Sequence, residues 1–283
     1  MRFPACATAL LILFLAASAA ASAQAPAANA SLPNPSELLA RAIANQKKIA
    51  AAQERYDCMV TDHATETDKN GNVKKTESVV KEQFFVNGIA IERTIQKNGK
   101  DLSPDEMKKQ DQRVMKETLK YSNQATAQKE TDKQDRQIED VLEAMMLVNG
   151  RRRIENGRSI LNYDIVPNPH FHARNLNQRF ATVMQGAISV DEQTGTVIDV
   201  NIKSVADLKI GGGVLANLHK GFWLHIHNHA QPDGVWLTDL AEGSGDARAA
   251  LFFHPYFHFK ETLNGCHLYT ATATQTGPAK PVK

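Results

Sequence analysis

Histidines at alternate positions are the feature of this sequence that most suggests chemistry. His225, His227 and His229 follow one another at every second residue, and residues 170–172 repeat the spacing. On a strand, such neighbours lie on one face roughly 6.5–7 Å apart, so two imidazoles could share a metal ion. A third ligand would have to come from elsewhere, such as His254 or His258, because no acidic residue stands in the same local pattern. A metal-dependent activity is therefore only a minor alternative.

A polar outer face is the simpler interpretation of the histidine run, with Leu224 and Ile226 pointing inward. Other catalytic patterns are missing: no Gly-x-Ser-x-Gly elbow occurs, and residues 243–245 have the composition of a loop. No pair of carboxylates is marked out for acid–base chemistry. The sequence therefore predicts a protein that is not an enzyme, with no cofactor and no metal site.

Aromatic residues point instead to the binding of an apolar group. An antiparallel sheet with aromatics on both faces, covered by helices with one apolar stripe, could enclose a cavity for an acyl chain. Methionine-rich helical faces can line adaptable apolar sites, although core packing is their commoner use. The candidate ligand-binding residues are Trp223, Trp236, Phe252 and Phe257, with Met145 and Met146 on a helix expected over 138–148. Ordinary core packing remains the alternative for each of them.

Antiparallel strands must position these side chains. Residues 186–203 alternate apolar and polar about a turn at 191–195, and a Pro-Asp-Gly turn at 231–234 joins two further strands. Residues 251–259 are apolar on both sides, with a bend at Pro255. Asn-Gly turns separate three earlier strands, and the glycines at 211–213 suggest a bulge in a curved sheet. The three earlier strands are expected at 56–67, 73–86 and 89–96.

Helices are expected at four places in all. Asn34 caps an amphipathic helix to about residue 53, and a charged, solvent-exposed helical insertion runs from about 103 to 133, frayed around 122–131. The apolar helix over 138–148 follows, then a strand over 153–166 and a short helix over 175–184. The basic residues at 151–153 are interpreted as a solvated strand end rather than a site for an anion or lipid headgroup.

The ends of the chain have the composition of export and tether segments. Residues 1–23 resemble a secretory signal, with Arg2 before a short apolar core and a small-residue cleavage site at 21–23. Residues 24–33 and 275–283 are expected to be a disordered linker and tail, and 34–274 a single domain. We therefore expect a periplasmic or secreted protein without a transmembrane segment after cleavage.

Two cysteines remain once the signal is removed. Cys58 and Cys266 lie near opposite ends of the expected domain, and an oxidising compartment favours a disulfide between them. Such a bridge would set the first strand against the last; two buried free thiols are the alternative. The formal net charge is +2, and no basic face is large enough to indicate nucleic-acid binding.

The order of elements resembles the periplasmic lipoprotein-carrier superfamily, which includes the LolA, LolB and RseB-type half-barrels. The likeness rests on the signal, the first helix, the Asn-Gly strands, the insertion and the pattern Gly-x-Ile-x-Val-Asp-x-x-Thr-Gly-x-Val from Gly186 to Val197. It implies an α+β, mostly antiparallel β fold: an unclosed curved barrel whose concave face is covered by helices. It also implies an apolar ligand or lipoprotein partner, as carrier or sensor. The alternative is an envelope interaction module with a filled core.

Overall fold

A computed structural model describes residues 31–210, 216–249 and 256–268. The expected signal, most of the linker and the C-terminal tail lie outside these ranges. So do the glycines at 211–213, Pro255 and the candidate residue Phe252.

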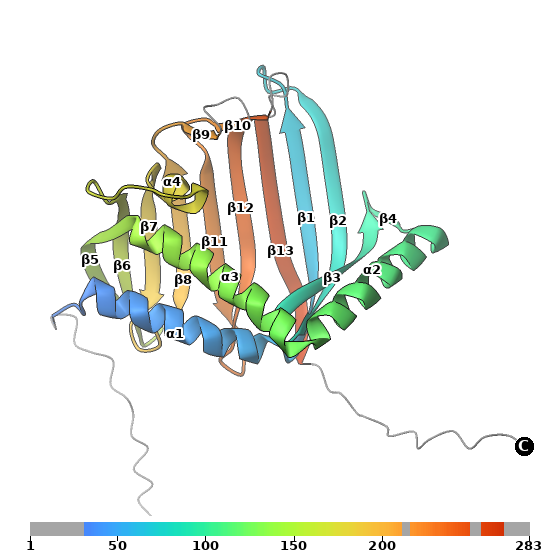
Figure 1. The fold of residues 1–283 in the computed structure, drawn as a ribbon, viewed down its shortest axis with the longest axis horizontal. Helices are drawn as coiled ribbons and strands as arrows, with labels where there is room; N and C mark the ends of the chain where they lie inside the picture. The colour runs from blue at the N-terminus through green and yellow to red at the C-terminus, as the bar shows by residue number, and fades with distance from the viewer. Residues whose placement is uncertain (1–30, 211–215, 250–255, 269–283) are drawn as a thin grey trace, which may run out of the picture.

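One antiparallel sheet forms the body of the molecule (Figure 1). Its main path has the order β4-β3-β2-β1-β13-β12-β11-β8-β7-β6-β5, and within the described chain its two end strands, β4 and β5, do not pair with each other. The predicted fold class, a mostly antiparallel and unclosed curved sheet, is confirmed. The strands are β1 (Tyr56–Thr67), β2 (Val73–Val86), β3 (Ile89–Lys97), β4 (Lys100–Asp101), β5 (Met145–Glu155), β6 (Arg158–Pro167), β7 (Met184–Asp191), β8 (Val197–Ser204), β9 (Leu208–Ile210), β10 (Ala216–Leu218), β11 (Trp223–Ala230), β12 (Trp236–Ala249) and β13 (Tyr256–Leu268).

Tight turns set the register between successive strands. Asn87 and Asn98 adopt positive φ in the turns after β2 and β3, as the Asn-Gly pairs predict. The hairpin β7–β8 is likewise confirmed. A single strand over 153–166 is wrong, because Asn156 also adopts positive φ and turns the chain between β5 and β6. That Asn-Gly pair carries the same signal as the others. The loop expected at 243–245 is also wrong: these residues lie within β12.

Within the described residues, four helices accompany the sheet: α1 (Pro35–Gln53), α2 (Pro104–Ser122), α3 (Gln124–Glu143) and α4 (Leu176–Ala181). Asn34 caps α1, and Ser103 and Glu106 form a capping box on α2. The expected fraying after Ser122 is wrong, since Asn123 ends α2 and caps α3 at once through a bond to the backbone of Thr126.

The apolar helix expected over 138–148 ends early. Helix α3 stops at Glu143, and Met145 and Met146 belong to strand β5. A short apolar run cannot be assigned to helix or strand from its spacing alone. Here the ladder with β6 decides, because Met145 pairs with Pro167 and Met146 with Val166.

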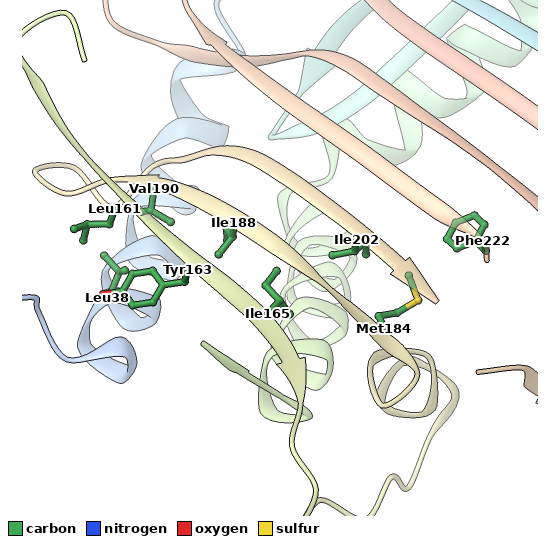
Figure 2. Close-up of a cluster of buried hydrophobic side chains, with 9 residues drawn as sticks. All are labelled: Leu38, Leu161, Tyr163, Ile165, Met184, Ile188, Val190, Ile202 and Phe222. Atoms are coloured by element: carbon green, nitrogen blue, oxygen red, sulfur yellow. The ribbon is translucent and has the colours of Figure 1, made fainter. Parts of the chain in front are cut away.

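Helices α1 and α3 cross the concave face of the sheet, which we call the inner face, whereas α2 diverges beside β3 and β4 (Figure 1). Leu38 of α1 is 1% exposed and packs on this face among the core residues of β6, β7 and β8 (Figure 2). The other core members are Leu161, Tyr163, Ile165, Met184, Ile188, Val190, Ile202 and Phe222. Burial of this apolar set positions α1 and closes one half of the inner face.

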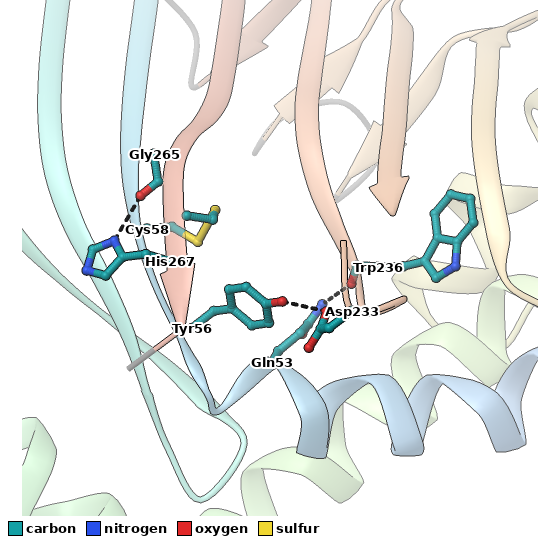
Figure 3. The surroundings of a disulfide bond; sticks show 8 residues. Gln53, Tyr56, Cys58, Asp233, Trp236, Gly265 and His267 are labelled. Carbon is teal, nitrogen blue, oxygen red and sulfur yellow. Dashed lines mark hydrogen bonds between the residues drawn. A yellow bond between two sulfur atoms is a disulfide. The ribbon is translucent and has the colours of Figure 1, made fainter. Parts of the chain in front are cut away.

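Hydrogen bonds hold α1 at both ends. Near its start, Arg41 donates to the carbonyl of Glu192 at 3.1 Å. At its end, Gln53 donates to the carbonyl of Trp236 at 3.1 Å, and the hydroxyl of Tyr56 donates to Asp233 at 2.5 Å (Figure 3). Burial first, and then the bond to Asp233, raise the pKa of Tyr56 to about 12, so this phenol remains a donor throughout the physiological range.

The disulfide Cys58–Cys266 is present (Figure 3). It joins β1 to β13, which are paired antiparallel from Tyr56↔Leu268 to Thr67↔Tyr256, so the expected contact of first and last strands is confirmed. Structural disulfides persist in oxidising compartments, which supports a location outside the cytoplasm.

The basic residues at 151–153 are not a uniformly solvated strand end. Arg151 and Arg153 are exposed, but the side chain of Arg152 is only 2% exposed and forms an ion pair with Glu192 at 2.5 Å. It also donates to the carbonyl of Ser31 at 3.1 Å. Arg152 therefore ties β5 to the β7–β8 turn and to the chain that leads into α1. Alternation along the strand, which turns the middle arginine inward, could have indicated this.

Substitution of Gly186 by alanine is expected to destabilise the protein by about 3 kcal/mol, because overpacking against backbone has no flexible side chain to yield. A Cβ there would overlap the carbonyl oxygen of Asn201 and lie 2.7 Å from the Cα of Ile202 on β8. Urea unfolding measures the loss. The neighbouring Ala187→Ser is the control, and equal midpoints for the two variants would contradict the prediction.

Candidate functional site

The central strands of the inner face carry apolar side chains that the helices do not seal. Residues paired directly across the ladder share a face, so the row Ile202, Leu224, Gly243 and Phe259 runs across β8, β11, β12 and β13. The next row brings Ile226 opposite Ala241. We name the half-buried side chains Leu224, Ile226, Phe257 and Phe259 the apolar floor.

Burial differs sharply along this face. On β6 and β7, Leu161 is 0% exposed and Val190 is 2% exposed, whereas every member of the apolar floor stays partly accessible. Helix α3 crosses in front of these strands (Figure 1), yet Ala127 near its start is the only residue of α3 that is buried. Ala64 on β1, opposite Phe259, is exposed. The inner face is thus packed at β6–β7 and open around the apolar floor and Ala64 of β1, whereas Cys58 and Val60, nearer the start of β1, are buried.

Two glycines of β12 let aromatic rings approach the strand closely. A Cβ at Gly243 would lie 2.8 Å from the ring of Phe259, and one at Gly245 would lie 2.8 Å from that of Phe222. The rings of Phe222 and Phe257 are 6.2 Å apart, which joins the apolar floor to the packed core. Because both positions are glycines within a strand, no side chain separates these rings from the backbone of β12.

Charged residues occupy the far end of the inner face. Lys81 on β2 forms ion pairs of 2.7 Å with both Asp62 on β1 and Glu92 on β3. Burial acts to lower the pKa of Lys81, but these two carboxylates outweigh it and raise that pKa. Glu261 on β13 lies directly opposite Asp62. The inner face therefore changes from apolar at β8–β13 to charged at β1–β3.

A cavity of about 450 Å³ opens at the end of β11, β12 and β13. Trp223 and Phe257 both line it, so the structure brings two of the predicted ligand-binding residues together. Trp223 pairs with Ser244 and Lys203 and so lies on the face opposite the apolar floor, where its ring is 6.2 Å from that of His258. The remaining lining residues are Thr65, Thr67, Lys220, Gly221, Ser244, Gly245, Asp246, Tyr256 and His258.

A second cavity, of about 600 Å³, lies beside the disulfide. Its apolar lining includes Met59, Phe84 and Phe85, and its carboxylates belong to Glu54, Asp57 and Glu82; Cys58, Gln83 and His267 complete it. No residue of this cavity was among the sequence candidates. Its lining comes from β1, β2, the end of α1 and the end of β13, which only the tertiary fold brings together.

The other predicted residues lie apart from these cavities. Met145 packs against the core, Met146 is 41% exposed on β5, and the ring of Trp236 lies 5.1 Å from the guanidinium of Arg158. Sequence reasoning missed Phe259, Leu224 and Ile226 as candidates. Their strict alternation with polar neighbours was the signal that could have selected them.

His225 and His227 lie on the outer face, beside acidic residues that the sequence pattern did not place near them. His225 contacts Asp199 at 2.8 Å and Glu242 at 3.5 Å, and His227 contacts Asp239 at 2.7 Å. Burial acts to lower the pKa of His225, but the two carboxylates outweigh it and raise that pKa. Among the described residues, no group of three or more such side chains has the arrangement of a metal site.

These features define the class: an antiparallel, unclosed sheet with helices across one face and an open apolar floor beneath one of them. No known family model matches the chain, and no curated protein matches it in sequence. Among solved structures, it is distantly similar to a DUF1329 family protein from Desulfovibrio piger, with 8% identity over 84% of this chain and 94% of that one, at a TM-score of 0.30. A structure of MucB in complex with MucA(peri) is also distantly similar, with 11% identity over 84% of this chain and 100% of that one, at a TM-score of 0.21.

None of the four helices is long and apolar enough to span a bilayer, as far as the described part of the chain extends.

Proposed function

We propose that this chain is an exported, periplasmic or secreted, non-catalytic protein that binds a lipid, an acyl chain or another apolar group against the apolar floor. One observation carries the proposal: Leu224, Ile226, Phe257 and Phe259 share the inner face and remain half exposed while the neighbouring strands are sealed. Covering such side chains releases roughly 25 cal/mol for each Å² of apolar surface removed from water.

The charged end of the inner face sets the orientation of the ligand. Lys81 and its partners Asp62 and Glu92 would lose hydration if an apolar chain covered them. The apolar part of the ligand therefore lies over β11–β13, and any polar group of the ligand faces β1–β3.

Helix α3 is the element that admits the ligand. Asn87 holds the last turn of α2, just before α3 begins, by donating to the carbonyl of Tyr121 at 2.7 Å, and Gln178 holds the end of α3 by donating to Asp140 at 2.9 Å. Between these anchors most of its side chains are exposed. A shift of the middle of α3 would therefore break few buried contacts.

A bulky side chain on the inner face tests this binding mode. Ala64→Phe places a ring beside Phe259, whereas His63→Phe places the same ring one residue away on the outer face. With a fluorescent fatty acid as probe, we expect the wild type and His63→Phe to bind alike and Ala64→Phe to bind roughly tenfold more weakly, a loss of about 1.4 kcal/mol.

Mass spectrometry of the protein purified from its native envelope provides the second measurement, and a co-purified lipid is expected. The absence of bound lipid, together with a wild-type protein that ignores the fatty-acid probe, would reject the proposal.

A protein-interaction module is the second candidate, favoured by a different observation. The β6–β7 half of the inner face is already filled, and α2 exposes Met115 at 63% and Leu119 at 69% one helical turn apart. A pull-down of envelope proteins with wild type and with Met115→Ser/Leu119→Ser separates the candidates. Only the interaction module predicts a specific partner that is lost from the double variant.

A further inference from the structure

Two carboxyl groups face each other across the junction of β1 and β13. Asp62 and Glu261 are directly paired in the antiparallel ladder and therefore share the inner face. This is the junction at which the first strand meets the last, and it is the junction that the disulfide crosses. Two like charges directly opposite each other weaken a strand pair.

The two oxygens of Asp62 have different surroundings. Oδ2 accepts an ion pair from Lys81 at 2.7 Å. Oδ1 is buried and receives no hydrogen bond from the described residues. A buried acceptor without a donor costs roughly 1–3 kcal/mol, and such atoms call for a specific cause. A proton on the opposing carboxyl group of Glu261 would supply the missing donor.

Two carboxyl groups and one amine surround Glu261. Asp62 faces it from β1, Lys81 from β2 and Glu92 from β3. On the β12 side its partner is Ala241, which carries no charge. From α2, Arg113 binds the backbone carbonyl of Glu92. Burial first, and then the charge of Asp62, raise the pKa of Glu261 against the opposing effect of Lys81.

We propose that Glu261 takes up a proton from solvent and, once protonated, donates a hydrogen bond to Oδ1 of Asp62. The two carboxyl groups then form a proton-operated latch between β1 and β13. Protonation of the latch replaces the repulsion between two carboxylates by a hydrogen bond. It also gives Oδ1 of Asp62 the donor that it lacks. Deprotonation restores two facing carboxylates on the inner face.

The latch also regulates the ligand site, a step that rests on the proposed function. Glu261 lies between Phe259 and Leu263 on the same face of β13, so its charge borders the apolar floor. An apolar ligand covers a neutral carboxyl group at far lower cost than a carboxylate. Binding and protonation therefore favour each other, and the ligand binds more tightly as the pH falls.

The sign of the stability effect follows from linkage. Because the folded protein holds the Glu261 proton more tightly than the unfolded chain, the stabilisation is complete below the unfolded pKa and is lost as the pH rises through the folded pKa. Glu261→Gln carries a permanent amide donor for Asp62. We expect this variant to melt roughly 2–4 °C above the wild type at pH 8, with a smaller difference at pH 5.

A direct titration tests the latch without a stability measurement. The side-chain carboxyl carbon of Glu261, followed by NMR, should titrate at higher pH in the folded protein than in the protein unfolded in urea. In folded Asp62→Asn the titration of Glu261 should move down toward that of the unfolded chain. If Glu261 titrates alike in the folded and unfolded wild type, or if Asp62→Asn leaves Glu261 unchanged, the latch is overturned.

The regulatory step has its own readout. Fatty-acid probe affinity should rise severalfold from pH 7.5 to 5.5 in the wild type and stay flat in Glu261→Gln, with Glu155→Gln, on the far edge strand β5, following the wild type. A probe that binds with the same affinity at both pH values overturns the regulation. A probe that binds at neither pH, beside a raised Glu261 titration, rejects the proposed function and leaves the latch supported.

Discussion

Loss of the Cys58–Cys266 bridge is expected to lower the free energy of unfolding by about 5 kcal/mol, the largest effect of any change considered. The bridge spans 208 residues and encloses almost the whole described sheet. In the chain-entropy model, the closed loop restricts the conformations of the unfolded chain. Removing the bridge restores that conformational entropy and so lowers the free energy of the unfolded state. The Cys58→Ala/Cys266→Ala variant, unfolded in urea, measures the change.

Reduction of the wild type provides the matched control. Wild type treated with dithiothreitol should unfold at the midpoint of the double variant, while the variant itself should not respond to the reductant. Two reactive thiols in the denatured, unreduced wild type would contradict the prediction, because they would show that no bridge had formed.

Replacement of Arg152 by alanine is expected to destabilise the protein by about 3–5 kcal/mol, the range seen when one partner of a buried ion pair is removed. The Arg152 guanidinium binds both oxygens of Glu192, at 2.7 and 2.5 Å. The bond to Arg152 is the main reason that the pKa of Glu192 is lowered, ahead of the opposing effect of burial. Without the arginine, a largely buried carboxylate remains, and the contact to the carbonyl of Ser31 before α1 is lost.

The adjacent Arg153→Ala is the control for charge and strand propensity. Arg153 is 55% exposed and pairs with Glu155, which is 54% exposed, so its loss should cost less than about 1 kcal/mol. Urea unfolding of both variants, with hydrogen exchange of the α1 amides, provides the comparison. Equal costs for the two arginines would show that Arg152 does not anchor α1.

The β7–β8 turn shows why Arg152 and α1 are coupled. Gly195 adopts a φ of +75°, and a Cβ there would lie 3.1 Å from the backbone of Arg41. Within the same turn, Thr196 accepts a hydrogen bond from Asn45 at 2.7 Å. The turn that the sequence identified as the end of a hairpin is thus also the docking point of a helix more than 140 residues earlier in the chain.

The proposed ligand site and the proposed latch lie on one surface. Phe259 and Glu261 are two residues apart on β13, with Ala64 and Asp62 opposite them on β1. A single pair of strands therefore carries both the apolar floor and the group that controls its charge. Their tests remain separate, because Ala64→Phe changes shape without charge and Glu261→Gln changes charge with little change in shape.

Local signals in the sequence determined most of the elements. Asn-Gly and Pro-Asp-Gly turns, the caps at Asn34 and Ser103 and period-two alternation specify strands and helix starts, because each depends on the φ angles and side chains of a few adjacent residues. The pairing of Cys58 with Cys266 was also predictable, since only two cysteines remain after the expected signal.

The tertiary structure decided what depends on residues far apart in the chain. The strand pairing made Met145 and Met146 part of β5 instead of a helix, turned Arg152 inward to Glu192 and placed Glu261 against Asp62. It also separated Trp223 from the apolar floor to which Phe259 belongs. Like-charge contacts and buried ion pairs are properties of such long-range pairs, so local alternation can indicate that a side chain points inward but not which residue it meets.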